Sequence, residues 1–391
     1  MSPLKISWKS IWSKPLSSAL NIMLIAFGTG ILTILLLAST QISDKLENNS
    51  KDIDLVVGAK GSPLQLILSS IYYIDFPTGN IPLKAAQELA RSPFVKKAVP
   101  LALGDNHNGV RIVGTDSNFV GIYKLKVKAG KFWQSDFETT IGTSVAENLK
   151  LKIGDTFYGA HGLTGSTDVH KTHAYKVAGI LAPQGNVTDN LILTNISSVW
   201  KMHDHEEEGE HHDEITSLLI QYRSPMSVVM FPRMVNESTN MQAASPAQES
   251  TRLFSLIGVG VDTLQWFAVL IMFIAAISVF VNLYNSLKER SYDLAIMRTL
   301  GASRGKLFLI VIAEGIMLTL AGTIIGIVLG HLALQFIGSN QESSQARLSG
   351  LIFLGEEAYL FVAGLAIGIF AAIIPAVQAY RSNISKILSK N

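Results

Sequence analysis

The sequence predicts an α-helical transmembrane protein with four spans and an inserted α+β extracytoplasmic domain. Of its 391 residues, 48% are hydrophobic and 16% are charged, whereas soluble domains usually carry about 25% charged residues. Runs free of Asp, Glu, Lys and Arg also occur at residues 15–43, 263–287, 315–341 and 358–380. Each run supplies the ~20 apolar residues that a helix needs to cross a bilayer.

The N-terminal segment, residues 1–16, has an amphipathic pattern. Leu4, Trp8 and Trp12 share one helical face beside Lys5 and Lys9, which is typical of a helix that lies on the inner membrane surface. We expect the first span to be a retained anchor, because its apolar core is longer than that of a signal peptide.

The predicted segments are an amphipathic helix 1–16, spans 17–40, 263–287, 307–337 and 358–380, an extracytoplasmic domain 41–262, a cytoplasmic loop 288–306, a short extracytoplasmic loop 338–357 and a cytoplasmic tail 381–391.

The distribution of Lys and Arg predicts the orientation. These residues gather in 1–16, 288–306 and 381–391, whereas 338–357 holds three Glu and one Arg. Positively charged loops stay in the cytoplasm, so we expect both termini to be cytoplasmic and residues 41–262 to lie outside. The formal net charge of +2 gives no reason to expect nucleic-acid binding.

Residues 41–262 show alternating apolar patterns that are typical of strands, together with short helical patterns. The segment 226–252 has a helical, polar pattern, and the apolar segment Leu64–Ile74 is a candidate contact for a partner subunit or for a lipidic or peptidic substrate. The predicted strands are Asp54–Val57, Val110–Gly114, Tyr175–Leu181 and Ser217–Tyr222, and the predicted helices are Leu83–Arg91 and Thr143–Leu149.

The cytoplasmic loop 288–306 has the composition of a docking helix. Apolar Leu294, Ile296, Met297 and Leu300 alternate with charges of both signs, which suits a helix held in a protein groove. The alternative is a helix that lies on lipid. Gly301 is a candidate helix C-cap. The candidate coupling residues are Glu289, Arg290, Asp293, Leu294, Met297, Arg298, Leu300 and Gly301.

Small residues recur at helical spacing in the last two spans. Gly322, Gly326 and Gly330 share one face of the third span, and Gly364 and Gly368 share one face of the fourth. Such faces let helix backbones approach closely, within one subunit or across a dimer, although Gly is common in membrane helices. Glu314, near the cytoplasmic end of the third span, is a functional candidate or a partner for a cytoplasmic Arg. We expect His331 to be interfacial or packed.

A histidine-rich run lies at His203–Glu214, where four His and seven acidic residues occur together. His203, His205, His211 and His212 could bind zinc weakly with help from carboxylates. The alternative is a solvated acidic hairpin tip. No zinc-protease motif, phosphate-binding loop or Cys is present in the sequence, so we predict no catalytic residues and no cofactor held by this chain.

Several stretches resemble the MacB/LolC/FtsX-type permeases of ABC transporters. The family pattern after the second span is roughly E-R-x-x-E-I-x-x-x-R-A-L-G-A, and this sequence has Lys288-Glu-Arg-Ser-Tyr-Asp-Leu-Ala-Ile-Met-Arg-Thr-Leu-Gly-Ala-Ser-Arg304, with Asp293 in place of the usual Glu. Further resemblances, in chain order, are Ala146–Asp155, Tyr175–Ile180, Glu314, Pro375 and Arg381.

The resemblance implies a permease subunit that pairs with a second permease copy and with a separate ABC ATPase subunit, which holds ATP and Mg. It implies that ATPase motions are transmitted to the extracytoplasmic domain, for efflux or extraction of a lipidic, peptidic or drug-like substrate. The expected location is the bacterial inner membrane, and a periplasmic adaptor or substrate protein is a candidate partner. The alternative is a non-transporting, metal-linked regulator of an extracytoplasmic partner.

Overall fold

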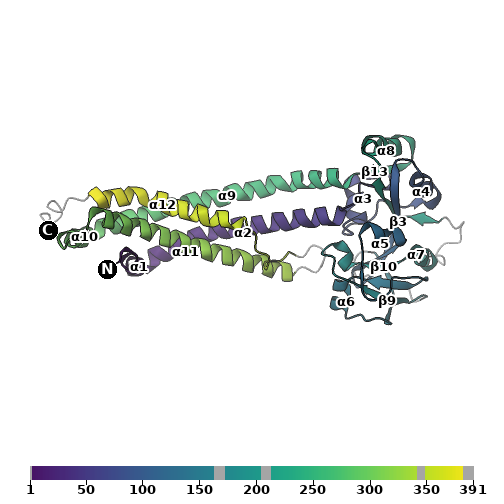
Figure 1. Cartoon of the computed structure of the whole chain (residues 1–391), viewed down its shortest axis with the longest axis horizontal. Helices are drawn as coiled ribbons and strands as arrows, with labels where there is room; N and C mark the ends of the chain where they lie inside the picture. The colour runs from purple at the N-terminus through teal and green to yellow at the C-terminus, as the bar shows by residue number, and fades with distance from the viewer. Residues whose placement is uncertain (1, 163–171, 204–212, 341–347, 382–391) are drawn as a thin grey trace. The chain divides into compact units, whose positions relative to one another are not determined.

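The computed structural model describes residues 2–162, 172–203, 213–340 and 348–381 (Figure 1). The chain forms two compact units. The helical unit contains residues up to Ile42 and from Gly258 onward, and the inserted domain contains Ser43–Ile257. Within the described residues, four helices are long and apolar enough to cross a membrane. The predicted fold class is therefore confirmed.

The four long helices extend beyond the charge-free runs. Helix α2 (Pro15–Ser50) continues past the predicted end of the first span, and α9 (Pro246–Glu289) begins well before residue 263. The helices run beyond the predicted spans, because polar residues such as those of 41–50 continue a helix without interrupting its backbone hydrogen bonds. The span boundaries themselves stay predictions. The remaining elements of this unit are α1 (Pro3–Ser13), α10 (Ser291–Thr299), α11 (Arg304–Ser339) and α12 (Glu357–Arg381).

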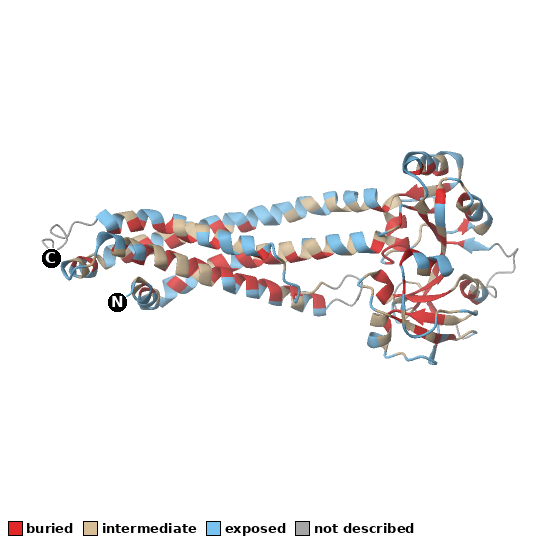
Figure 2. Ribbon diagram, viewed as in Figure 1, coloured by how far each residue is buried: buried red, intermediate tan, exposed pale blue. Residues whose placement is uncertain are grey.

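Each long helix carries buried residues on one side and exposed residues on another (Figure 2). The exposed sides are rich in large apolar residues, such as Phe267 on α9 and Leu332 on α11. This is the pattern of helices that face lipid on the outside and one another on the inside. The inner cluster contains Ile25, Ala275, Val279, Leu283, Ala371 and Ala372.

The inserted domain is built on one continuous mixed sheet with strand order β13-β1-β12-β3-β4-β10-β6-β9-β5. Strand β3 (Val95–His107) pairs with β12 along its first half and with β4 along its second half, so it joins both ends of the sheet. β10 is parallel to β4, and β6 is parallel to β9. The other bounds are β1 Leu55–Ala59, β4 Val110–Thr115, β5 Val127–Gly130, β6 Glu138–Ile141, β9 Tyr175–Leu181, β10 Ile192–Asn195, β12 Ser217–Tyr222 and β13 Met241–Ala244.

Short elements surround this sheet. β7 (Thr156–Phe157) pairs with β9, β8 (Ala160–His161) pairs with β3, and β2 (Ile81–Pro82) pairs with β11 (Glu214–Ile215). Side chains of Ser62 and Asp116 accept hydrogen bonds from backbone N–H groups in the first turns of α3 and α5, which satisfies donors that a helix start leaves free. The domain helices are α3 Pro63–Ser70, α4 Leu83–Ala90, α5 Ser117–Ile122, α6 Thr143–Leu149, α7 Ile196–His203 and α8 Pro225–Ser238.

The strands predicted at Tyr175–Leu181 and Ser217–Tyr222 and the helix predicted at Thr143–Leu149 are confirmed at their bounds. Two predictions were wrong. The segment 226–252 is not one helical stretch, because edge strand β13 separates α8 from α9. The apolar segment Leu64–Ile74 is mainly core rather than a contact surface, since Leu66, Ile67 and Ile71 are fully buried against the sheet.

Candidate functional site

Helix α10 is fixed at both ends between two membrane-spanning helices. A single residue, Arg290, separates it from α9. At its other end, Gly301 has φ +97° and donates its N–H to the Arg298 carbonyl, while Ala302 donates to the Met297 carbonyl. This Schellman arrangement requires a left-handed residue, which Gly adopts without strain. The capping role predicted for Gly301 is therefore confirmed.

One face of α10 is packed into the helical unit. Leu294 and Ala295 are buried, and Leu294 packs with Leu307 and Ile310 of α11. Met297 is half-buried against the same cluster. Leu294 and Met297 thus face the spanning helices, where they also line a cavity. Their predicted coupling role stays a prediction.

The opposite face of α10 is exposed and apolar. Tyr292, Ile296 and Leu300 are exposed, and Leu300 has 82% of its surface accessible. Their spacing of four residues places them along one face of the helix. Asp293 is also exposed, whereas Arg298 is half-buried. We call Tyr292, Ile296 and Leu300 the α10 stripe.

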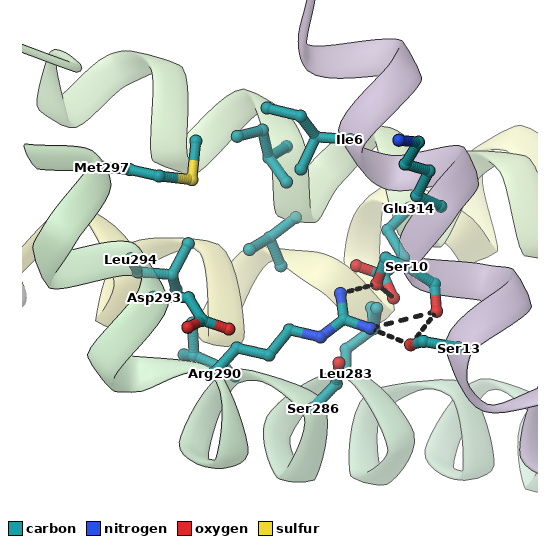
Figure 3. Close-up of a pocket in the computed structure, with 14 residues that line it drawn as sticks. Ile6, Ser10, Ser13, Leu283, Ser286, Arg290, Asp293, Leu294, Met297 and Glu314 are labelled. Atoms are coloured by element: carbon teal, nitrogen blue, oxygen red, sulfur yellow. Dashed lines mark hydrogen bonds between the residues drawn. The ribbon is translucent and has the colours of Figure 1, made fainter. Parts of the chain in front are cut away.

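A polar network joins α1 to the start of α10 and to α11 (Figure 3). Arg290 donates to the Oγ and carbonyl oxygen of Ser10 and to the Oγ of Ser13. Ser10 Oγ donates in turn to Glu314, whose surface is only 8% exposed. Ser7 Oγ donates to the carbonyl of Ile310 at 2.8 Å. The small polar residues of α1 therefore face α11, while Trp8 and Trp12 remain exposed.

The predicted pairing of Glu314 with an Arg is indirect, because Ser10 lies between the carboxylate and the Arg290 guanidinium. A buried carboxylate needs hydrogen-bond donors to offset its lost hydration. Glu289 instead points to the surface, where it forms an ion pair with Lys14. An exposed pair of this kind contributes little to stability.

The network lines one side of a cavity of about 450 Å³. Its polar wall includes Lys9, Ser13, Ser286 and Asp293, and its apolar wall includes Leu283. Figure 3 shows Arg290 reaching from the start of α10 toward Ser10 and Ser13. The cavity is thus amphipathic and lies where α1, α9, α10 and α11 meet.

The five glycines lie at helix contacts within this chain. A Cβ added at Gly326 would lie 2.6 Å from the Ala26 carbonyl, and one at Gly322 would lie 2.7 Å from the Ile25 Cβ. A Cβ added at Gly330 would lie 2.7 Å from the Thr33 Cβ. This face of α11 therefore packs against α2. Gly364 and Gly368 of α12 pack on α11 at Thr323 and Thr319.

The predicted metal site lies largely outside the described residues. His203 ends α7, and His205, His211 and His212 fall in 204–212, beyond what the structure describes. Within the described ranges, no group of three or more His, Cys, Asp or Glu is placed to hold a metal ion.

Sequence reasoning missed Tyr292 of the stripe and the serines of α1. Ser7 and Ser10 were detectable, because they lie on the face of α1 opposite Trp8 and Trp12. Their role could not be deduced from α1 alone, since their partners are Ile310, Arg290 and Glu314 in distant parts of the chain.

Two models of known protein families match this chain. The model of the MacB-like periplasmic core domain matches residues 18–236, and the model of the FtsX-like permease C-terminal region matches residues 266–384. The two matches cover both the inserted domain and the helical unit that carries α10. The chain belongs to the MacB/LolC/FtsX-type permeases of ABC transporters.

Two curated relatives are similar at low identity. The lipoprotein-releasing system transmembrane protein LolC of Neisseria meningitidis serogroup B is 24% identical over 62% of this chain and 60% of its own length. The uncharacterized ABC transporter permease MJ1507 of Methanocaldococcus jannaschii is 24% identical over 61% of each chain. The chain thus matches about three fifths of the length of these relatives.

Two solved structures are also similar. The periplasmic region of MacB from Actinobacillus actinomycetemcomitans is 11% identical, covers 54% of this chain and 97% of that chain, and has a TM-score of 0.35. The extracellular domain of the noncanonic ABC-type transporter YknZ from Gram-positive bacteria is 13% identical, covers 49% of this chain and 99% of that chain, and has a TM-score of 0.33.

Proposed function

We propose that this permease binds a separate ABC ATPase through the α10 stripe and transmits ATPase motions to its inserted domain. The observation that carries the proposal is the outward face of α10, where Tyr292, Ile296 and Leu300 are exposed on a helix whose other face buries Leu294 and Ala295. A short helix that presents apolar anchors four residues apart suits a groove on a protein partner.

A protein partner accounts for the stripe better than a lipid surface does. Asp293 is exposed beside Tyr292, and an acidic residue gains nothing from the anionic lipids of an inner leaflet. Arg304 is exposed at the start of α11. An apolar centre with charges of both signs at its edge is the usual composition of a protein interface.

The attachment of α10 supports a mechanical role. Its start is held through Arg290 to α1, and its buried face is held through Leu294 to α11. A load applied to the stripe would therefore move α9, α10 and α11 together. Helices α2 and α9 include residues of both the helical unit and the inserted domain, so we propose that these two helices carry the motion.

The distribution of Lys and Arg supports cytoplasmic termini, a cytoplasmic α10 and an extracytoplasmic inserted domain in a bacterial inner membrane. We propose that two permease copies act together in efflux or extraction of a lipidic, peptidic or drug-like substrate, with a periplasmic adaptor or substrate protein as a further partner. The Neisseria relative is named as a lipoprotein-releasing system transmembrane protein, which supports a lipidic cargo. Nothing among the described residues favours the non-transporting alternative.

The test is copurification with the ATPase encoded nearest to this chain, followed by ATP hydrolysis in lipid nanodiscs. In one variant Ile296→Ser and Leu300→Ser are combined, and in the control Val229 of the inserted domain, which is also exposed, is changed to Ser. Removal of two apolar anchors should weaken ATPase binding by about 100-fold, while the control binds normally. Equal ATPase binding by both variants would overturn the proposal that the α10 stripe is the docking surface. If the wild-type chain binds no ATPase, the proposed function fails.

A further inference from the structure

The connection between α11 and α12 carries an unusual run of exposed apolar residues. Leu351, Ile352 and Phe353 are consecutive, and Leu351 and Phe353 are 73% and 77% exposed. One face of the Phe353 ring stacks on His331 with a centroid distance of 4.5 Å. A turn in water usually presents polar side chains, so this connection differs from an ordinary surface loop.

The backbone of the connection is held by side chains from three helices. Gln41 of α2 forms two hydrogen bonds of 2.8 Å with the N–H and carbonyl of Ser349. On α11, Gln335 accepts from the N–H of Gly350, and His331 Nδ1 donates to the Gly350 carbonyl at 2.6 Å. At the start of α12, Glu357 accepts from the N–H of Leu354 at 2.8 Å.

The same side chains also bond to one another. His331 Nε2 lies 3.0 Å from Glu357 Oε2, and both residues are buried. Gly350 lies so close to α11 that an added Cβ would be 2.0 Å from the His331 carbonyl oxygen. In the described residues 348–356, the backbone groups of Ser349 and Gly350 therefore bond to α2 and α11, while the apolar side chains of Leu351 and Phe353 remain exposed.

The contacts place residues 349–354 at the level of His331 and Gln335 rather than at the last residue of α11. His331 lies eight residues before Ser339, the last residue of α11, which corresponds to about 12 Å along the helix axis. Helix α12 begins at that same level, because Gly364 packs on Thr323 and Gly368 packs on Thr319. Twenty residues of helix span about 30 Å, the thickness of a hydrocarbon core. A core that begins at the level of Gly315 on α11 therefore ends at the level of Gln335.

We propose that Leu351, Ile352 and Phe353 insert into the bilayer at the boundary between headgroups and acyl chains, where they contact lipid. Irregular backbone is tolerated near membrane depth only where protein groups satisfy its polar atoms. Gln41, His331, Gln335 and Glu357 bond the backbone of Ser349, Gly350 and Leu354, which flank the three apolar residues, and the Leu351 N–H donates to Ser349 Oγ. Exposed Leu332 and Phe336 lie on α11 at the same level, so the insertion extends an apolar surface that the spanning helices already form. His331 and Glu357 act as positioning residues for this lipid contact.

The absence of Cys from the sequence permits a direct test in lipid nanodiscs, where reagents reach both sides of the bilayer. Phe353→Cys is the test variant, Val229→Cys is a water-exposed control at 73% exposure, and Leu332→Cys is a lipid-facing reference on α11. A negatively charged thiol reagent should modify Phe353→Cys at least about tenfold more slowly than Val229→Cys, because the reactive thiolate is disfavoured in apolar surroundings. Its rate should match that of Leu332→Cys.

A second readout separates lipid from a protein occupant. A fluorophore attached at position 353 should be quenched by phospholipids brominated near the headgroup end of the acyl chain, as it is at position 332, while the label at position 229 is not. Rapid modification of Phe353→Cys would overturn the proposal. Slow modification without quenching would also overturn it, because the site would then be covered by a second copy or another protein. These outcomes do not depend on ATPase binding.

Discussion

The two connections at opposite ends of α11 both expose large apolar residues, but their surroundings differ. Tyr292, Ile296 and Leu300 lie on a regular helix with the exposed carboxylate of Asp293 beside them. Leu351, Ile352 and Phe353 lie on an irregular segment. The backbone of its flanking residues Ser349, Gly350 and Leu354 is bound by side chains of Gln41, His331, Gln335 and Glu357.

The difference teaches that exposed apolar residues must be interpreted together with the backbone that carries them. A helix satisfies its own backbone hydrogen bonds in water or in lipid, so the α10 stripe is defined as a protein contact by the charges around it. An irregular segment needs water or other protein groups. Since the α11–α12 connection takes protein groups and has apolar side chains, its arrangement suits a site with little water.

The largest expected effect follows from Gly350→Val. Its Cβ would meet backbone atoms of α11 at 2.0 and 2.8 Å, so the connection would have to separate from His331 and Gln335. We expect a loss of about 3 kcal/mol in the free energy of unfolding, at the upper end for overpacking. The matched control is Gly355→Val, since nothing lies within 4 Å of a Cβ at Gly355.

Unfolding can be measured by denaturant titration in detergent, with thiol modification at Phe353→Cys as a local readout. Gly350→Val should make that thiol react faster, whereas Gly355→Val should not. Equal stability of the two valine variants would show that the connection is not held against α11.

The second prediction separates the two faces of α10. Leu294→Ala removes a buried side chain from a cluster with Leu307 and Val311, so it should destabilise the chain by about 2 kcal/mol or more. Leu300→Ala should change stability by less than about 0.5 kcal/mol, because that side chain is 82% exposed. Denaturant titration gives the stability, and copurification gives ATPase binding. If Leu300→Ala is the more destabilising change, the assignment of inner and outer faces is wrong.

Much of the fold could be predicted because its signals are local. The four spans were predicted from charge-free runs, and β9 was predicted from the alternating apolar pattern between Tyr175 and Leu181. The Leu64–Ile74 segment was misjudged because an apolar run has the same sequence whether it covers a surface or fills a core. Its burial depends on the sheet that packs over it.

The site was predictable only in part for the same reason. The sequence identified α10 and the cap at Gly301, but it could not assign Leu294 to the inner face and Leu300 to the outer face. That division is set by Leu307, Ile310 and Val311, which lie on α11. The roles of Ser10 and Gln41 depend on partners about 300 positions away, at Glu314 and Ser349.

The smallest expected effect concerns the network that joins α1 to α10. Ser10→Ala removes the hydroxyl that links Glu314 to Arg290 and leaves the buried carboxylate without that donor. The expected loss is about 1.5 kcal/mol in the free energy of unfolding, as for a hydrogen bond to a charged group. Ser13→Ala is the matched control. Its hydroxyl accepts from Arg290 and donates to the Ser10 carbonyl at 2.7 Å, and neither bond involves the buried carboxylate. Its loss should therefore cost less, about 1 kcal/mol.

The same two variants test whether α1 belongs to the coupling machinery. With the ATPase bound, Ser10→Ala should lower ATP hydrolysis that depends on the permease more than Ser13→Ala does, because only Ser10 connects α1, α10 and α11. If Ser10→Ala lowers stability but leaves this ATPase activity unchanged, the network is structural and force reaches the membrane through α9 and α11 without α1.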